Sequence, residues 1–111
     1  MLFQDKINEY LNRTRRTKTL SDGSTFEDVR PRVECVDGFR ISVQASQYHY
    51  CTPRCNGVVE YETVELGSPN VVDPLIIDYA EDPEDPTHTV YGYVTVDIVC
   101  ELVEKHGGII N

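Results

Sequence analysis

The sequence predicts an α+β fold, a small antiparallel sheet of about four strands packed by an N-terminal and a C-terminal helix. Near both ends of the 111-residue chain, apolar residues recur at three- and four-residue steps, whereas between the ends they alternate with polar residues. Turns rich in glycine, proline and asparagine separate the alternating stretches. At this length we expect a single domain over residues 1–111, with a helix over 2–18 and an α+β core over 32–110.

The first expected helix, over residues 2–18, has one apolar face and a gradient of charge. Acidic side chains come early and basic ones late, as the helix dipole favours. Its apolar face consists of Leu2, Phe3, Ile7, Tyr10 and Leu11. After a polar loop, Ser24 or Thr25 is expected to cap a short turn that Pro31 stops.

A β-hairpin is expected over residues 32–45, with Asp37 and Gly38 at its turn. Apolar side chains alternate with polar ones along both arms: Val33, Cys35, Phe39, Ile41 and Val43. By this parity, Cys35 lies on the apolar face of its strand.

The second half of the chain is expected to alternate short elements with loops. A third strand is expected over residues 58–66. Asp73 and Pro74 begin a short helix, because proline is favoured at the first helical position. Residues 81–86 form an acidic loop that two prolines keep irregular, and a last strand follows over 89–94.

The closing helix is expected to be capped by Thr95 or Asp97 and to stop at Gly107 and Gly108. One face of it carries Val96, Val99, Cys100 and Val103. Cys100 is therefore expected to point into the core, as Cys35 does.

The segment over residues 48–55 gathers two thiols, an imidazole and two tyrosines. Pro53 biases it toward a turn, and the three-residue gap between Cys51 and Cys55 falls inside the spacing of zinc knuckles. A second close pair of ligands is lacking, so the remaining ligands have to converge through the fold. The expected ligands of one structural zinc ion are Cys35, Cys51, Cys55 and Cys100, with His49 in reserve.

Two other interpretations of the cysteines stay open. Free cysteines are often buried as small apolar side chains, which suits Cys35 and Cys100. A disulfide would require an oxidising compartment, and the N-terminus lacks the basic segment and apolar run of a secretory signal. Since no apolar run approaches the roughly 20 residues of a membrane span, we expect a soluble intracellular protein.

Charge is divided unevenly along the chain, whose formal net charge is -9. Residues 1–54 carry nine Lys and Arg against seven Asp and Glu, whereas residues 55–111 carry one, Lys105, against twelve. The acidic half repels nucleic acid and attracts a basic surface. The alternative is that its acidic excess only keeps a small protein in solution.

Motifs for common enzyme chemistry are missing from the sequence. It has no glycine-rich phosphate loop, no G-x-S-x-G elbow and no H-E-x-x-H pair. Tryptophan is absent and basic residues are not interleaved with aromatic ones, so nucleic-acid binding is also poorly supported.

Several short stretches resemble a family of small uncharacterised proteins of phages and prophages of Gram-positive bacteria. The resemblance covers about residues 33–110 and rests on these stretches: Asp37-Gly38-Phe39, Ser42-Val43-Gln44-Ala45-Ser46, Tyr48-His49-Tyr50-Cys51-x-Pro53-Arg54, Val64-Glu65-Leu66-Gly67-Ser68-Pro69, Val90-Tyr91-Gly92-Tyr93-Val94 and His106-Gly107-Gly108-Ile109. More narrowly, the chain is similar to type II-A anti-CRISPR proteins of streptococcal prophages, which are small zinc-containing inhibitors. In this family Cys51 is more dependable than Cys55, which weakens the assignment of Cys55 as a zinc ligand.

The resemblance implies a protein that acts in the cytoplasm of a bacterial host on a type II CRISPR effector nuclease. Such nucleases hold nucleic acid in a positively charged channel, which an acidic protein can occupy in place of target DNA. The expected contact carboxylates are Glu60, Glu62, Glu65, Glu81, Asp82, Glu84 and Asp85. The alternatives are a small zinc enzyme, with three protein ligands and an open position, and a phage accessory protein that binds no nuclease.

Overall fold

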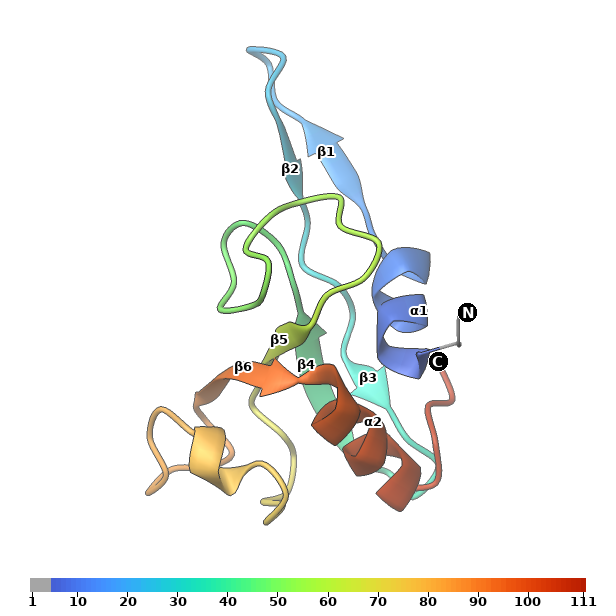
Figure 1. Ribbon diagram of the computed structural model, residues 1–111, viewed down its shortest axis with the longest axis vertical. Coiled ribbons are helices and arrows are strands. Elements are labelled where there is room, and N and C mark those ends of the chain that lie inside the picture. The colour runs from blue at the N-terminus through green and yellow to red at the C-terminus, as the bar shows by residue number, and fades with distance from the viewer. Residues whose placement is uncertain (1–4) are drawn as a thin grey trace.

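The structure, a computed structural model, describes residues 5–111 of the chain (Figure 1). This part contains two α-helices, one 3-10 helix and six strands. In chain order the elements are α1 (Lys6–Arg13), β1 (Thr17–Thr19), β2 (Thr25–Glu27), β3 (Val33–Glu34), β4 (Arg40–Gln44), β5 (Thr63–Gly67), η1 (Ile77–Tyr79), β6 (Val90–Thr95) and α2 (Val96–Lys105). The expected α+β class is confirmed, with one helix near each end of the chain.

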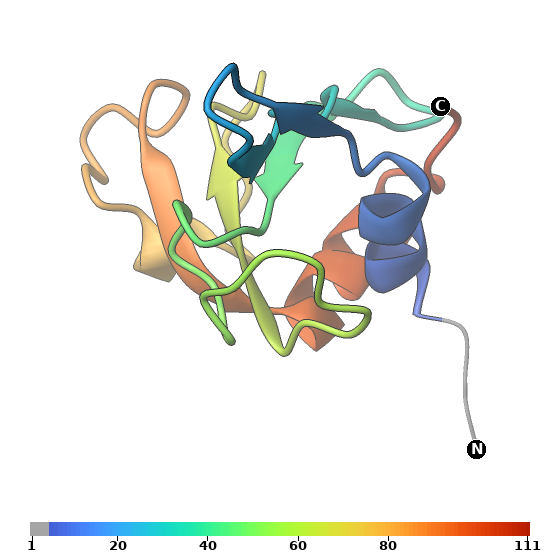
Figure 2. The same ribbon diagram turned by 90° about the horizontal axis from the view of Figure 1, so that it is seen from above.

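Four strands form the main sheet, in the order β3-β4-β5-β6, with every neighbouring pair antiparallel. Both helices lie to one side of this sheet (Figure 2). The side chains on one face of the sheet are fully buried, among them Val43, Val64, Leu66, Tyr91 and Val94. The expected hairpin over residues 32–45 is confirmed as β3 and β4, and its apolar side chains are in the core.

Helix α1 begins where the sequence can cap it. The Asp5 carboxylate accepts hydrogen bonds from the backbone N–H groups of Ile7 and Asn8, at 2.9 and 3.0 Å, which satisfies two donors that a helix start leaves free. The helix ends at Arg13, so the expected continuation to residue 18 is wrong. The start expected at residues 2–4 lies outside the described residues.

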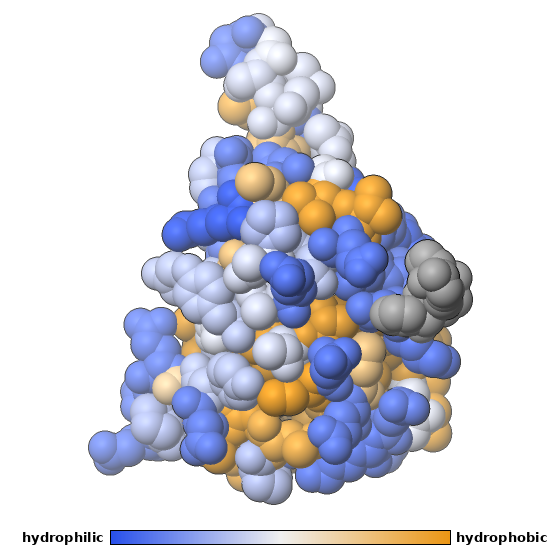
Figure 3. Space-filling model, in the orientation of Figure 1, coloured by the Kyte–Doolittle hydropathy of each residue, from blue (hydrophilic) through white to orange (hydrophobic). Residues whose placement is uncertain are grey.

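A hairpin of β1 and β2 replaces both the end of the expected helix and the turn expected after Ser24 or Thr25, and that expected turn is wrong. Residues 17–25 are all exposed, and the hairpin projects from the body (Figure 1). Its surface is mostly polar in Figure 3, as expected for a segment that packs no apolar face against the body. Its base is held by the buried Glu27, which pairs with Arg15 and Arg30.

Strand β5 begins at Thr63, five residues later than expected from the pattern over 58–66. The preceding chain is tied to α1, because the Asn8 side chain accepts a hydrogen bond from the Tyr61 N–H at 2.7 Å and donates one to the Tyr61 carbonyl at 3.0 Å. These bonds use the backbone groups with which Tyr61 would otherwise extend the strand. Val59, just before it, is 73% exposed.

The remaining expected elements are present with adjusted ends. The short helix expected from Asp73 is a turn followed by η1, residues 81–86 form a loop, and the last strand is β6. Thr95 occupies the N-cap position of α2, and Val96, Val99 and Val103 are buried as the helical spacing predicts. Neither helix in residues 5–111 has the length and apolar character needed to cross a membrane.

Candidate functional site

Four carboxylates surround a shallow hollow at the C-terminal end of β6. Asp5, Glu60, Glu62 and Asp97 line it together with Tyr61, Thr95 and Val96, and its volume is about 300 Å³. No Lys, Arg or His side chain is among these lining residues. Two of the expected contact residues, Glu60 and Glu62, therefore lie beside two carboxylates that the sequence did not associate with them.

Both helices begin at this hollow, which explains why it tolerates so much negative charge. Asp5 caps α1, and Asp97 lies in the first turn of α2. The N-terminus of a helix carries a partial positive charge that stabilises nearby carboxylates. Glu62 is held next to α2 because its carbonyl accepts a hydrogen bond from the Val96 N–H at 3.1 Å.

A second acidic group lies at the opposite end of β6, in the loop over residues 81–85. All five of these residues are exposed, as expected for a loop. The loop is fastened to β6, because the Glu81 N–H donates to the Val90 carbonyl at 3.0 Å and the Asp82 N–H donates to the Thr89 hydroxyl at 3.0 Å. Asp85 pairs with the exposed His88 at 3.0 Å.

Glu65 lies between the two acidic groups, on β5. Its side chain is half-buried, and its Oε1 accepts a hydrogen bond from the Tyr50 N–H at 2.9 Å. The expected contact residues are thus distributed over three places, the hollow, β5 and the acidic loop, rather than gathered at one. Since β6 rises about 17 Å over its six residues, the hollow and the acidic loop are separate surfaces at its two ends.

Little positive charge offsets these carboxylates. Lys105, the only Lys or Arg of residues 55–111, is engaged by the buried Asp73 at 3.0 Å. Within residues 5–111, Glu60, Glu62 and Glu65 form no salt bridge with a basic side chain.

The four cysteines are free and lie in different surroundings. Cys35 is buried at the end of β3, where its backbone forms an isolated β-bridge with Ile109. Cys100 is half-buried in α2, with its Sγ 3.5 Å from Asp5 Oδ1. Cys51 is buried and its Sγ donates to the Ser46 carbonyl at 3.3 Å. Cys55 is exposed.

Without a metal ion these thiols are protonated at neutral pH, and they are not gathered in one place within the described residues. Burial raises the pKa of Cys35 and of Cys100 to about 11 and also raises the pKa of Cys51, whereas zinc binds the thiolate. Nowhere in residues 5–111 do three or more His, Cys, Asp or Glu side chains gather as metal ligands. His49, the reserve ligand, bonds Ser46 Oγ at 2.7 Å, and burial lowers the pKa of its imidazole. Zinc therefore stays a prediction from the sequence.

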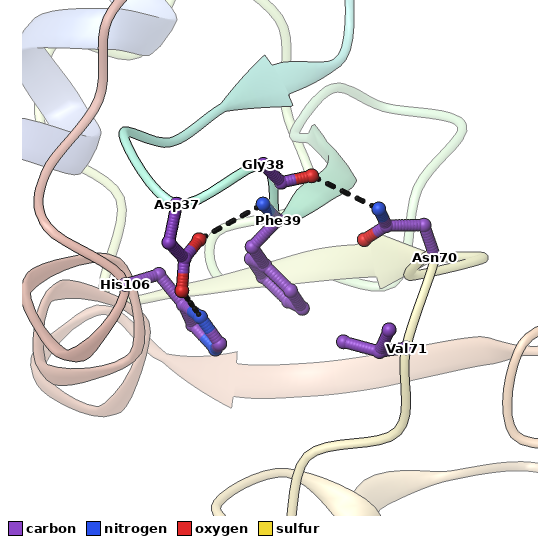
Figure 4. Close-up of a pocket in the computed structure, with 6 residues that line it drawn as sticks. All are labelled: Asp37, Gly38, Phe39, Asn70, Val71 and His106. Carbon is purple, nitrogen blue, oxygen red and sulfur yellow. Dashed lines mark hydrogen bonds and ion pairs between the residues drawn. The ribbon is translucent and has the colours of Figure 1, made fainter.

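The sequence did not indicate a cluster around His106, which lies just beyond the end of α2 (Figure 4). Its Nδ1 lies 2.7 Å from Asp37 Oδ2, and its Nε2 lies 2.9 Å from Asp73 Oδ2. The imidazole stacks on the Phe39 ring, with centroids 4.0 Å apart and planes 7° from parallel. Asp73 and Asp37 are 33 and 69 positions from His106 in sequence, so no local spacing could have revealed the cluster.

The His106 cluster borders a hollow of about 250 Å³ whose other lining residues include Asn70 and Val71 (Figure 4). The Asn70 side chain is used within the fold, since it accepts from the Arg40 N–H and donates to the Gly38 carbonyl. The polar groups around this hollow are thus paired with one another, as in a structural contact rather than a ligand site. We call the contacts of His106 with Asp37, Asp73 and Phe39 the His106 clasp.

Comparison with known protein families, curated proteins and solved structures found no match to this chain.

Proposed function

We propose that the chain is a non-enzymatic inhibitor, a phage-encoded anti-CRISPR protein that binds a type II CRISPR effector nuclease through its acidic surface. One observation carries the proposal. The twelve carboxylates of residues 55–111 are accompanied by a single Lys or Arg side chain, Lys105, which is engaged by a buried aspartate. The exposed carboxylates are therefore left for a partner to neutralise.

The partner is a protein with a positively charged channel for nucleic acid. The chain's surface charge steers its approach to that channel in the cytoplasm of the host, and occupation of the channel keeps target DNA out. Because the contacts are between exposed charges, association slows as salt is added. The two acidic groups at the ends of β6 are the contact sites, and Glu65 lies between them.

Charge reversal tests the proposal. The variant Glu81→Lys, Asp82→Lys, Glu84→Lys and Asp85→Lys changes only exposed loop residues, so the fold is expected to survive. We expect it to associate with the nuclease about tenfold more slowly or worse, and with a weaker dependence on salt, because rim charges act mainly on the association rate. The measurement is the association rate by surface-based kinetics at low and moderate salt.

A matched control separates the position of the charges from their sum. Reversal of four other exposed glutamates produces the same change in net charge and touches no side-chain hydrogen bond among residues 5–111: Glu9, Glu34, Glu101 and Glu104. The control is expected to retain most of the binding. Equal losses in both variants would mean that total charge alone acts, and unchanged association of the loop variant would reduce the loop to solubilising surface. Arg15 is unsuitable as a control, because it pairs with the buried Glu27.

A further inference from the structure

A β-bulge in β6 turns Tyr93 outward. Val64 pairs with Val94 while Leu66 pairs with Tyr91, so Glu65 faces two residues of β6, Gly92 and Tyr93. In regular alternation Tyr93 would share the buried face of Tyr91. With the bulge, Tyr91 and Val94 are fully buried and Tyr93 is 50% exposed.

The backbone at Tyr93 is in the left-handed region, with φ at 54°. A bulky side chain is rarely found there, whereas glycine and asparagine adopt it readily. The positive φ belongs to Tyr93 and not to the preceding Gly92, although glycine would adopt it at less cost. The bulge lets Tyr91 and Val94 both be buried, but the exposed Tyr93 ring is not needed for this, and strained backbone is often found at functional positions.

The Tyr93 ring is part of a fixed pair of exposed rings. It lies 5.8 Å from the Tyr50 ring, which is 42% exposed, and the Tyr93 N–H donates to the Tyr50 carbonyl at 3.0 Å. Gly92 permits this approach, because a Cβ at that position would lie 3.2 Å from the Tyr50 Cβ. Arg54 of the chain itself places its guanidinium 5.3 Å from the Tyr50 ring centre, so an incoming cation has to use the Tyr93 ring or the other face of Tyr50.

Acidic residues adjoin these rings. Glu65 accepts a hydrogen bond from the Tyr50 N–H, and Thr95, the next exposed residue of β6 after Tyr93, lines the hollow with four carboxylates. Two residues along a strand correspond to about 7 Å, the reach of one long side chain. One basic segment of a partner could therefore place one cationic side chain on the rings and another in the hollow.

We propose that Tyr50 and Tyr93 form an aromatic docking site for arginine side chains of the partner protein, next to the acidic hollow. The inference rests on the proposed function and names the anchor of the same interface. Arginine suits the site better than lysine, because its planar guanidinium stacks on an aromatic face while the N–H groups along its edge stay free to donate to a carboxylate. The carboxylates steer the partner, and the rings hold it.

The substitution Tyr93→Asn tests the inference, because asparagine tolerates the left-handed backbone and removes the ring. We expect the melting temperature to stay the same or rise, and binding to the nuclease to weaken roughly 30-fold, mainly through faster dissociation. Ser68→Asn is the matched control: within residues 5–111 Ser68 is the other non-glycine residue with positive φ, at 42°, and it follows Gly67 at the far end of β5. It is expected to bind normally.

A second arm uses a short oligo-arginine peptide and an oligo-lysine peptide of equal length, followed by amide NMR. The arginine peptide is expected to shift the signals of Tyr50, Gly92 and Tyr93 in the natural chain and to bind more tightly than the lysine peptide. If the chain fails to bind the nuclease but shows these shifts, the proposed function falls and the docking site stands.

Three results would overturn the docking site. Unchanged nuclease binding by Tyr93→Asn would leave the proposed function in place and remove the anchor. Equal affinity for both peptides, with shifts confined to the acidic loop, would reduce recognition to charge alone. A dimer of the natural chain that Tyr93→Asn dissociates would show that the rings serve a second copy of this chain.

Discussion

The His106 clasp makes a specific prediction about stability, because it fastens the end of α2 to the turn between β3 and β4 and to the segment before η1. His106→Ala removes the hydrogen bond to Asp73, whose side chain is 3% exposed, and the stacking on Phe39. A hydrogen bond to a buried ionised group contributes about 1.5–3 kcal/mol, and a stacked ring pair about 0.5–1.5 kcal/mol. Asp37 is solvent-exposed and is left out of the estimate.

We therefore expect His106→Ala to lower the free energy of unfolding by about 2–4 kcal/mol. For a domain of this length, that corresponds to a fall in melting temperature of about 8–16 °C. Thermal unfolding followed by circular dichroism measures it. His88→Ala is the matched control, since the His88 side chain is 75% exposed and pairs only with exposed groups, and we expect it to change the melting temperature by less than about 2 °C.

The stability that His106 contributes should also depend on pH, and the direction follows from its pKa. Burial lowers the pKa of His106, but the hydrogen bonds and charges of Asp37 and Asp73 outweigh burial and raise this pKa above 6.5. A raised histidine pKa contributes stability that is complete below pH 6.5 and is lost as the pH rises through the higher folded pKa. The natural chain should therefore lose the stability that His106 contributes as the pH rises above 6.5.

The two carboxyl groups of the clasp act at the acidic end. The hydrogen bond from His106 lowers the pKa of Asp37. Burial raises the pKa of Asp73, but the Leu75 N–H, His106 and Lys105 outweigh it and hold that pKa below 3.8. Their stabilising effect is present above pH 3.8 and is lost as the pH falls through the lower folded values. The clasp is thus strongest between about pH 4 and pH 6.5.

Burial lowers the pKa of His49, so its contribution changes with the opposite sign and below pH 6.5. The difference between the natural chain and His106→Ala removes this contribution and isolates the clasp. The reasoning is refuted if that difference does not shrink as the pH rises above 6.5, or if His106→Ala melts within about 2 °C of the natural chain.

Two further predictions concern the C-terminal segment and the cysteines. Gly107→Ala should destabilise the chain by about 2–4 kcal/mol in urea unfolding, since its φ is +94° and an added Cβ would lie 2.8 Å from the Val36 Cβ. Gly108→Ala is the control, because Gly108 has a similar φ but open space around it, and it should cost about 1–2 kcal/mol. Equal costs for the two substitutions would contradict the clash. Elemental analysis of chain purified without chelator should find about one zinc, as the sequence predicts, and Cys51→Ser should lose metal and thermal stability together. Metal-free protein would remove that prediction, and alkylation of the folded chain should then modify the exposed Cys55 before Cys35, Cys51 and Cys100.

Local periodicity was sufficient to predict the main sheet and both helical regions. Alternation around Asp37 and Gly38 predicted the hairpin of β3 and β4, and helical spacing predicted the buried face of α2, because these patterns reflect which side of an element is buried. Tertiary contacts decided what the patterns did not. The start of β5 depends on hydrogen bonds between Tyr61 and Asn8, 53 residues away.

The hairpin of β1 and β2 escaped prediction because it buries almost nothing. Thr17, Lys18 and Thr19 are all exposed, so no alternation marks them as a strand, and the preceding basic residues suited a longer helix. The candidate surface was predicted only in part. Charge along the sequence pointed to Glu60 and Glu62, but only the fold brings Asp5 and Asp97 to them, and only the bulge turns Tyr93 outward.

Order of addition in a cleavage assay tests the central claim, that the acidic chain occupies the channel in place of target DNA. A guide-loaded type II effector nuclease is mixed with the chain either before or after its target DNA, and the cleaved fraction is measured under conditions that allow one round of cleavage. The account predicts strong inhibition when the chain is added first and little inhibition once the DNA is bound. Equal inhibition in both orders, or cleavage unaffected in either, would contradict it.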